Sequence, residues 1–150
     1  MASDKPPTVE EIAATWISYH LWSASRSQPE SSRRRTLAEF QEEDAESDRQ
    51  GFWAWEAVHA LVHEQPEQGW LMILRLVDLA PDDRTLANVA AGPLENLLGS
   101  QPYVFIDRVE HQSRTDAKFR RCLSGVWGSS SIPDYVQERM RRTWEGEDPL

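Results

Sequence analysis

The stretch FWAWEAVHALVHEQPEQGWLMILRLVDLA, residues 52–80, decides the fold. Its apolar side chains recur every three or four residues, which is the period of an α-helix with one buried face. Pro66 interrupts this pattern at a place that suits proline, the first position of a new helix. The stretch therefore predicts two consecutive helices, the second with an apolar stripe made of Trp70, Ile73, Leu74 and Val77.

Helical patterns continue on both sides of this hairpin. TVEE at residues 8–11 is a capping box, with Thr8 as the N-cap, and it opens a helix that we expect to end near Ser23. Downstream, PDD supplies a turn and an N-cap for the next helix, and Pro102 occupies a first helical position. No window alternates apolar and polar residues over the length of a strand. The chain is predicted to be all-α, with six to eight helices.

A short internal repeat in the sequence indicates how the helices pack. LVHEQP at 61–66 and LLGSQP at 97–102 are offset by 36 residues, and the offset places apolar residues on apolar residues. This period is typical of helical-hairpin solenoids, so we expect HEAT- or TPR-like hairpins packed as a short right-handed array. Gly69 against Phe105 is a poor match. The alternative, that two ordinary hairpins share a proline, stays open.

AAGPLENLLG, residues 90–99, contains a Gly-Pro pair that could be a phosphate-binding loop or a joint between helices. A phosphate loop needs several glycines and usually a lysine, and Glu95 stands where an anion would lie. We therefore predict a joint, in which Gly92 ends one helix and Pro93 begins the next.

Residues 1–7 are predicted to be a flexible tail and residues 8–150 a single helical domain. Within that domain, residues 24–50 are acidic and poor in apolar side chains, and we expect a partly mobile insert with a short helix near 30–46. The Arg33–Arg35 run is expected to pair with acids one turn further on, such as Glu39.

The net charge of −9 narrows the choice of partners. Such a surface repels nucleic acid and anionic membranes and attracts a basic protein, although solubility alone would also explain it. A single cysteine and the absence of a signal-peptide pattern indicate a cytoplasmic protein, and the excess of arginine over lysine suggests a bacterial source. We expect a basic protein partner, with no nucleic acid and no membrane.

EAVHALVH, residues 56–63, carries the spacing of metal-binding helices. His59 and His63 are four residues apart, and His20 could supply a third ligand. The motif lacks the glutamate of a zinc protease, and helical phase turns both histidines away from the core. Cys122 is expected to be a small buried hydrophobe, and no serine-nucleophile elbow is present. We therefore expect no cofactor, no metal site and no enzyme.

Tryptophan is abundant, with seven residues, and helical phase does not bury all of them easily. Trp53 points well away from the Ala54, Trp55 and Val58 face that we expect in the core, so it is either a recognition anchor or covered by the 24–50 segment. Trp22, Trp127 and Trp144 raise the same question. The residues expected to bind a partner are Trp53, Glu42, Glu43, Asp44, Asp107, Arg108 and Glu110.

FWAWEAV, PEQGWLMILRLV, AAGPLENLL, FIDRVE and FRRCLSGVW, within residues 51–127, resemble a bacterial family catalogued only as a domain of unknown function. The acidic stretch at 35–50 and the C-terminal helix lie outside the resemblance. It implies a helical, bacterial, cytoplasmic protein and no particular activity. Its pattern includes Gly92, Pro93, Glu95, Asp107, Arg108 and Trp127. We interpret Gly92 and Pro93 as a joint, and Glu95 as part of a helix start. Asp107 and Arg108 are interpreted as an ion pair or an exposed face, and Trp127 as a core residue.

The leading hypothesis is a non-catalytic protein-binding module, for example an immunity or antitoxin-like protein that neutralises a basic toxin. Two alternatives stay open. One is a metal-dependent helical enzyme that uses His20, His59 and His63. The other is a structural helical-repeat scaffold or homodimer.

Overall fold

The computed structural model describes residues 4–26, 36–127 and 131–150. The segments α5, η1 and α6 run on from one another as one continuous helix, and counted in this way the described residues form eight helices and no strand. The predicted all-α class is confirmed. The elements are α1 (Val9–Arg26), α2 (Leu37–Gln50), α3 (Phe52–Glu64), α4 (Pro66–Leu79), α5 (Asp83–Val89), the π-helical turn η1 (Ala90–Leu94), α6 (Glu95–Ser100), α7 (Pro102–Thr115), α8 (Ala117–Ser124) and α9 (Asp134–Thr143).

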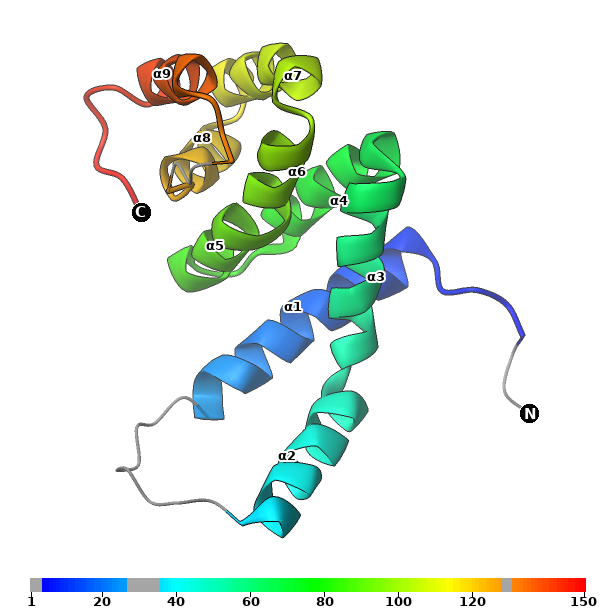
Figure 1. Ribbon diagram of the computed structural model, residues 1–150. Coiled ribbons are helices and arrows are strands. Elements are labelled where there is room, and N and C mark those ends of the chain that lie inside the picture. Colours follow the sequence, from blue (N-terminus) through cyan, green and yellow to red (C-terminus); the bar gives the residue numbers. More distant parts are fainter. Residues whose placement is uncertain (1–3, 27–35, 128–130) are drawn as a thin grey trace.

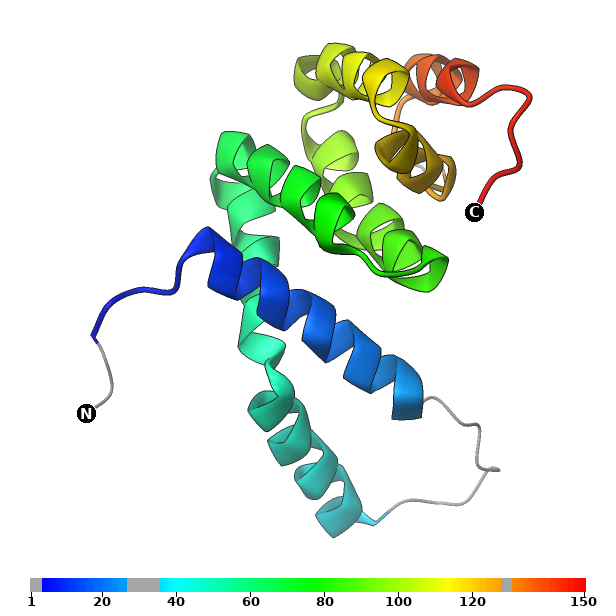
Figure 2. The same ribbon diagram turned by 180° about the vertical axis from the view of Figure 1, so that it is seen from behind.

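The helices pack against their neighbours in the chain and form an elongated molecule (Figure 1). The hairpin of α3 and α4 lies at its centre, and α1 packs against both of these helices. At one end, α7, α8 and α9 form a small group, in which α7 packs against α8 and α9. At the other end, α2 projects away from the rest, as the view from behind also shows (Figure 2).

Aromatic rings from distant parts of the chain meet in the core. Trp16 of α1 is 1% exposed, and Trp70 of α4 is 7% exposed. The Trp70 ring lies 6.1 Å from that of Phe105 on α7 and meets that of Phe119 on α8 edge-on at 5.6 Å. Burial of one large apolar side chain stabilises a fold by ~1.5–3 kcal/mol. These rings therefore tie the α7–α9 group to the central hairpin.

Four helix starts, those of α1, α4, α5 and α7, are the ones that the sequence predicts. The Thr8 amide donates to Glu11 Oε2 at 2.7 Å, and the Glu11 amide donates to Thr8 Oγ1 at 3.2 Å, which completes the capping box. Asp82 accepts from the Thr85 amide at 2.8 Å as the N-cap of α5. Pro66 and Pro102 each occupy the first position of a helix, where proline's missing N–H has no cost.

The predicted internal repeat is visible in the structure at the two Gln-Pro turns. Gln65 has φ −135° and ψ 70°, and Gln101 has φ −135° and ψ 53°. Each glutamine ends one helix and precedes the next, and its amide donates to a carbonyl four residues earlier, Leu61 or Leu97. The 36-residue offset also places buried Trp70 on buried Ile106. The two hairpins thus share their turn and their core positions, whereas HEAT- or TPR-like packing as a short right-handed array stays a prediction.

The predicted break at Gly92 and Pro93 is wrong. The chain stays helical from Asp83 to Ser100, and Pro93 lies inside the helix. A proline in an α-helix removes one hydrogen bond and crowds the preceding turn, and the wider π-helical turn absorbs both effects. The Glu95 amide donates back to the Ala90 carbonyl across this turn. Gly92 does not adopt a positive φ, so its conformational freedom is not used.

Two tryptophans predicted for the core lie on the surface. Trp127 is 79% exposed, because α8 ends at Ser124 and the chain has left the helix before this residue is reached. Trp55 is 38% exposed. It stands about 100° from Ala54 on the helix, so it lies at the border of the buried face of α3 and not within it.

The acidic segment differs in its limits from the prediction. Helix α1 continues to Arg26, and α2 runs from Leu37 to Gln50 rather than over residues 30–46. Arg33–Arg35 lie outside the described residues. In the part of the chain that the structure describes, no helix is both long enough and apolar enough to cross a membrane.

Candidate protein-binding surface

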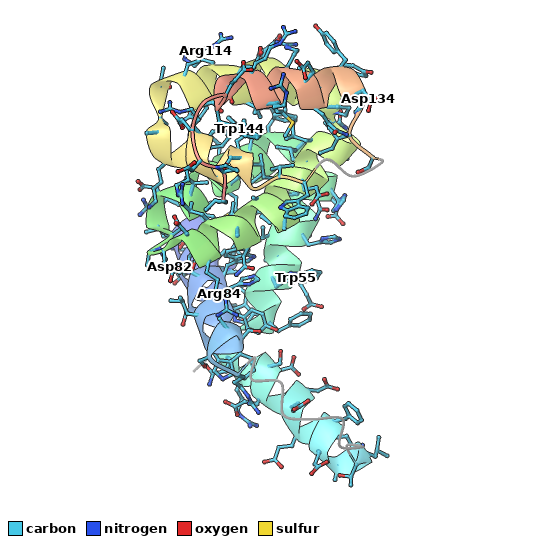
Figure 3. The ribbon with its side chains drawn as sticks, turned by 90° about the vertical axis from the view of Figure 1, so that its left-hand side faces the viewer. Trp55, Asp82, Arg84, Arg114, Asp134 and Trp144 are labelled. Atoms are coloured by element: carbon cyan, nitrogen blue, oxygen red, sulfur yellow. The ribbon has the colours of Figure 1, made fainter. Side chains whose placement is uncertain are left out.

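Helix α2 stands out because it has no buried residue over its 14 positions. Figure 3 shows its side chains radiating on both sides of the ribbon, beyond the body of the molecule. An isolated helix of this length is only marginally stable in water, so local interactions must hold it. Tertiary packing of an apolar face, the usual source of helix stability, contributes little here.

A second capping box begins this helix. The Thr36 amide donates to Glu39 Oε2 at 2.8 Å, and the Glu39 amide donates to Thr36 Oγ1 at 3.2 Å. Further along, Arg49 and Gln50 both donate to the carboxylate of Glu46. These bonds lower the pKa of Glu46, that from Gln50 most, so the carboxylate is kept charged. Capping and side-chain pairs therefore supply the local stability that α2 needs.

The direction of α2 is set at Gly51, which lies between α2 and α3. Gly51 has φ +109°, in the left-handed region that residues other than glycine rarely adopt. A Cβ at this position would also lie 2.4 Å from Cγ2 of Thr15 on α1. A hydrogen bond of 3.0 Å joins Tyr19 of α1 to Ser47 of α2. The glycine and this bond hold the C-terminal end of α2 against α1.

The outer end of α2 combines apolar side chains with negative charge. Leu37 is 73% exposed and Phe40 is 50% exposed. Six acidic residues and one arginine lie in the same helix, which gives a formal charge of −5. Of the predicted binding residues, Glu42 and Asp44 are exposed, and Glu43 is partly buried. The structure thus brings these acids together with two apolar side chains that the sequence did not identify as binding residues.

Trp53 lies just beyond Gly51, on α3, and is 41% exposed. It borders a shallow groove of about 510 Å³ that is otherwise lined by Lys5, Pro7, Glu11 and Thr15. Of the two alternatives left open for Trp53, its exposure fits a ring on the surface, and its role in binding a partner stays a prediction. The groove beside it could not be predicted, because it requires the residues before α1 to run past α3.

Asp107 and Glu110 are paired within the chain. Arg139 of α9 donates to Asp107 at 2.6 Å and also to Glu110, and its guanidinium lies over the Tyr135 ring. These bonds raise the pKa of Arg139, that to Glu110 most. Both acids were predicted to bind a partner, and both take part in the contact between α7 and α9.

Arg108 faces a different helix from its neighbour Asp107. Its guanidinium donates to both carboxylate oxygens of Glu67 on α4, at 2.5 and 3.0 Å. This bidentate pair lowers the pKa of Glu67. The predicted polar face of Asp107, Arg108 and Glu110 is therefore divided between two links to other helices. Its role in binding a partner remains a prediction.

The three histidines do not form one site. His20 is half-buried on α1, its ring centroid 3.9 Å from that of Trp16, and burial lowers its pKa to about 4. His59 and His63 are exposed on α3. Over residues 4–26, 36–127 and 131–150, no three histidine, cysteine or acidic side chains come together as metal ligands. The three-histidine alternative therefore has no supporting geometry.

In the rest of the molecule, one feature, a groove, was not predicted from the sequence, and another, the burial of Cys122, was predicted correctly. A groove of about 310 Å³ between α8 and α9 was missed, since it depends on how these two consecutive helices pack. It is lined by residues that include Leu123, Met140 and Trp144. Cys122 was predicted to be buried, and it is. Its thiol donates to the Leu86 carbonyl at 3.4 Å, and burial raises its pKa to about 12, which removes it as a nucleophile at neutral pH.

Comparison with known proteins places the chain in a family. Residues 41–148 match the model of a family of unknown function (DUF6869), and the chain belongs to it. The match extends further in both directions than the resemblance over 51–127, and includes most of α2 and all of α9. Helix α1 lies outside it. No curated protein and no solved structure matches the chain significantly.

Proposed function

We propose that this DUF6869 protein is a non-catalytic protein-binding module that uses α2 to bind a basic protein. The observation that carries the proposal is that α2 buries no residue of its own while it exposes Leu37 and Phe40. Exposure of apolar side chains to water is unfavourable, so a partner that covers those on a projecting helix gains binding free energy. Residues 41–50 of this helix lie within the part of the chain that matches the family, whereas Leu37 and Phe40 precede it.

Charge selects the kind of partner. The six acids of α2 attract a positively charged surface over a distance of about one Debye length, ~8–10 Å in physiological salt. Leu37 and Phe40, three residues apart, stand on neighbouring positions of one helical face. An amphipathic helix with such anchors fits into an apolar groove of a partner. The partner that fits is a protein with an apolar groove and a basic rim.

A protein that neutralises a cationic toxin, as immunity and antitoxin proteins do, would belong to this functional class. A second copy of the same chain is a poorer partner. Each copy would bring a helix with a formal charge of −5 into the interface, and like charges at close range oppose association. We therefore assign the basic partner to a different protein.

Affinity capture with matched variants tests the proposal. Wild-type protein would be immobilised and exposed to a lysate of the source organism at low and high salt. The α2 variant would carry Leu37→Ser and Phe40→Ser, and the control variant Tyr135→Ser, since Tyr135 is 63% exposed on α9. We expect a basic protein that binds the wild type and the control at low salt, and that is lost in the α2 variant and at high salt.

Three results would contradict the proposal. One is that every captured protein binds the α2 variant as well as the wild type. Another is that capture does not depend on salt. The third is sedimentation evidence for a dimer that Leu37→Ser and Phe40→Ser abolish, because the surface would then bind a second copy. Circular dichroism of each variant would verify that the helices are retained.

A further inference from the structure

The outward face of α3 carries a row of rings. Phe52 and Trp55 are stacked with their centroids 5.4 Å apart, and Trp55 and His59 are stacked at 5.1 Å. His59 is followed by His63, whose ring centroid lies 4.3 Å away. Figure 3 shows Trp55 on α3 between the body and α2. The row therefore belongs to α3, whereas the exposed side chains of the proposed binding surface belong to α2.

The two imidazoles at the end of this row are free to bind a ligand. Both His59 and His63 are exposed. Across the described ranges, no hydrogen bond and no ion pair of the protein engages either ring. Stacking on Trp55 restricts the orientation of the His59 ring. A ligand that bound both rings would thus displace only water and would find one ring already partly oriented.

We infer that His59 and His63 form a two-histidine site for a divalent transition-metal ion. One ion can bind two imidazoles when each ligating nitrogen lies ~2.0–2.1 Å from it, which places the two nitrogens roughly 3 Å apart. Ring centroids 4.3 Å apart on one helical face allow this distance after small side-chain rotations. Nitrogen ligands favour copper, nickel and zinc ions over magnesium.

The site is a binding site and not a catalytic centre. In the described part of the chain no third histidine, cysteine or acidic side chain joins the pair. The remaining coordination positions therefore go to water. The inference is independent of the proposed function, because it concerns α3 and an ion, whereas the proposed function concerns α2 and a protein.

Isothermal titration calorimetry on the full-length chain without a tag tests the site. Cu²⁺, Ni²⁺, Zn²⁺ and Mg²⁺ salts would be titrated separately at pH 7.5 in a buffer that does not chelate them. We expect one ion per chain for the first three, Cu²⁺ the tightest, and no binding of Mg²⁺. Removal of one imidazole leaves a single ligand, so His59→Ala and His63→Ala should each weaken binding by about tenfold or more.

Two controls separate the pair from histidine content. His111→Ala removes an exposed histidine of α7 and should leave the affinity unchanged. The double substitution His63→Ala with Glu64→His keeps the number of histidines but moves one about 100° around the helix, and it should bind as weakly as His63→Ala. Cu²⁺ should also quench tryptophan fluorescence, and Trp55→Phe should remove most of this quenching.

The inference fails if none of the three ions binds with saturation. It also fails if His111→Ala weakens binding as much as His59→Ala does, or if the double substitution retains wild-type affinity. Circular dichroism of each variant verifies that α3 is intact, and both histidines are exposed, so their replacement leaves the core unchanged.

Discussion

Gly69 of α4 lies directly against the backbone of Val62 on α3. A Cβ placed on Gly69 would stand 2.8 Å from the Val62 Cα and 3.1 Å from its nitrogen. Real Cβ atoms essentially never approach backbone atoms so closely, and backbone cannot move aside as a flexible side chain can. The first turn of α4 can therefore rest on α3 only because residue 69 has no side chain.

The first prediction is that Gly69→Ala destabilises the protein by about 2 kcal/mol. An added methyl group forces α3 and α4 apart, and overpacking of this kind typically costs ~1–3 kcal/mol. Urea unfolding monitored by circular dichroism measures the change. Gly92→Ala is the matched control, because nothing lies within 4 Å of its Cβ position and its φ is not positive. The control should be neutral or slightly more stable, and an equal loss in both variants would contradict the interpretation.

Gly69 also illustrates what the sequence can predict about this fold. Pro66 and Pro102 predict two helix starts, and the 36-residue offset predicts which apolar residues share the core. The mismatch of Gly69 with Phe105 is visible in the sequence as well. Its cause is not visible, because the approach to Val62 depends on how two helices cross. Local rules thus predict elements and turns, but not the contacts between them.

The errors at Pro93 and Trp127 have different causes. Pro93 was treated as a helix start, which is its commonest helical role, but a π-helical turn lets the helix continue through it. Trp127 was interpreted as a core residue, although α8 ends three residues earlier, at Ser124. The sequence placed Glu42, Glu43 and Asp44 of α2 in the candidate site, but not the two apolar residues of the same helix. Leu37 and Phe40 look like core anchors in sequence, and only the projection of α2 leaves them exposed.

The second prediction concerns the link between α7 and α9. Arg139→Met should destabilise the protein by about 1 kcal/mol, because it leaves Glu110 on α7, whose side chain is 15% exposed, without its main partner. Arg141→Met is the control. Arg141 forms exposed ion pairs with Glu138 and Glu145, which are only three and four residues away in the sequence, so its replacement should have no measurable effect. Thermal unfolding of both variants makes the comparison. Equal melting temperatures for the two variants would contradict a role for Arg139 between helices.

The third prediction is that Cys122 reports global unfolding. Burial raises the pKa of its thiol to about 12, so at pH 8 the native protein contains almost no thiolate and gives reagents no access. The colorimetric thiol reagent DTNB should therefore leave the folded chain unmodified and react with one thiol per chain in urea. Fast reaction of the native protein would show that α8 opens locally, and would contradict the packing of Cys122 against α5.

The fourth prediction is a pH dependence of stability that comes from His20. Burial lowers the pKa of His20 to about 4 in the folded chain, against 6.5 for an exposed histidine. Between these two values the unfolded chain binds more protons, so the free energy of unfolding falls as the pH is lowered from 7 towards 4. Because the ring is only half-buried, the expected loss by pH 5 is about 1 kcal/mol.

His20→Leu isolates this contribution. The variant removes the titrating group and the Nε2 atom, which is buried without a hydrogen-bond partner in the described structure. The free energy of unfolding, measured in urea at pH 7, 6 and 5, should decline in the wild type and decline less in His20→Leu. His111→Leu, on an exposed face of α7, should keep the wild-type slope. The interval from pH 7 to 5 lies above the range in which carboxylates take up most of their protons. If the pH dependence of the free energy of unfolding persists in His20→Leu, another histidine is responsible for it and His20 is hydrated in the folded protein.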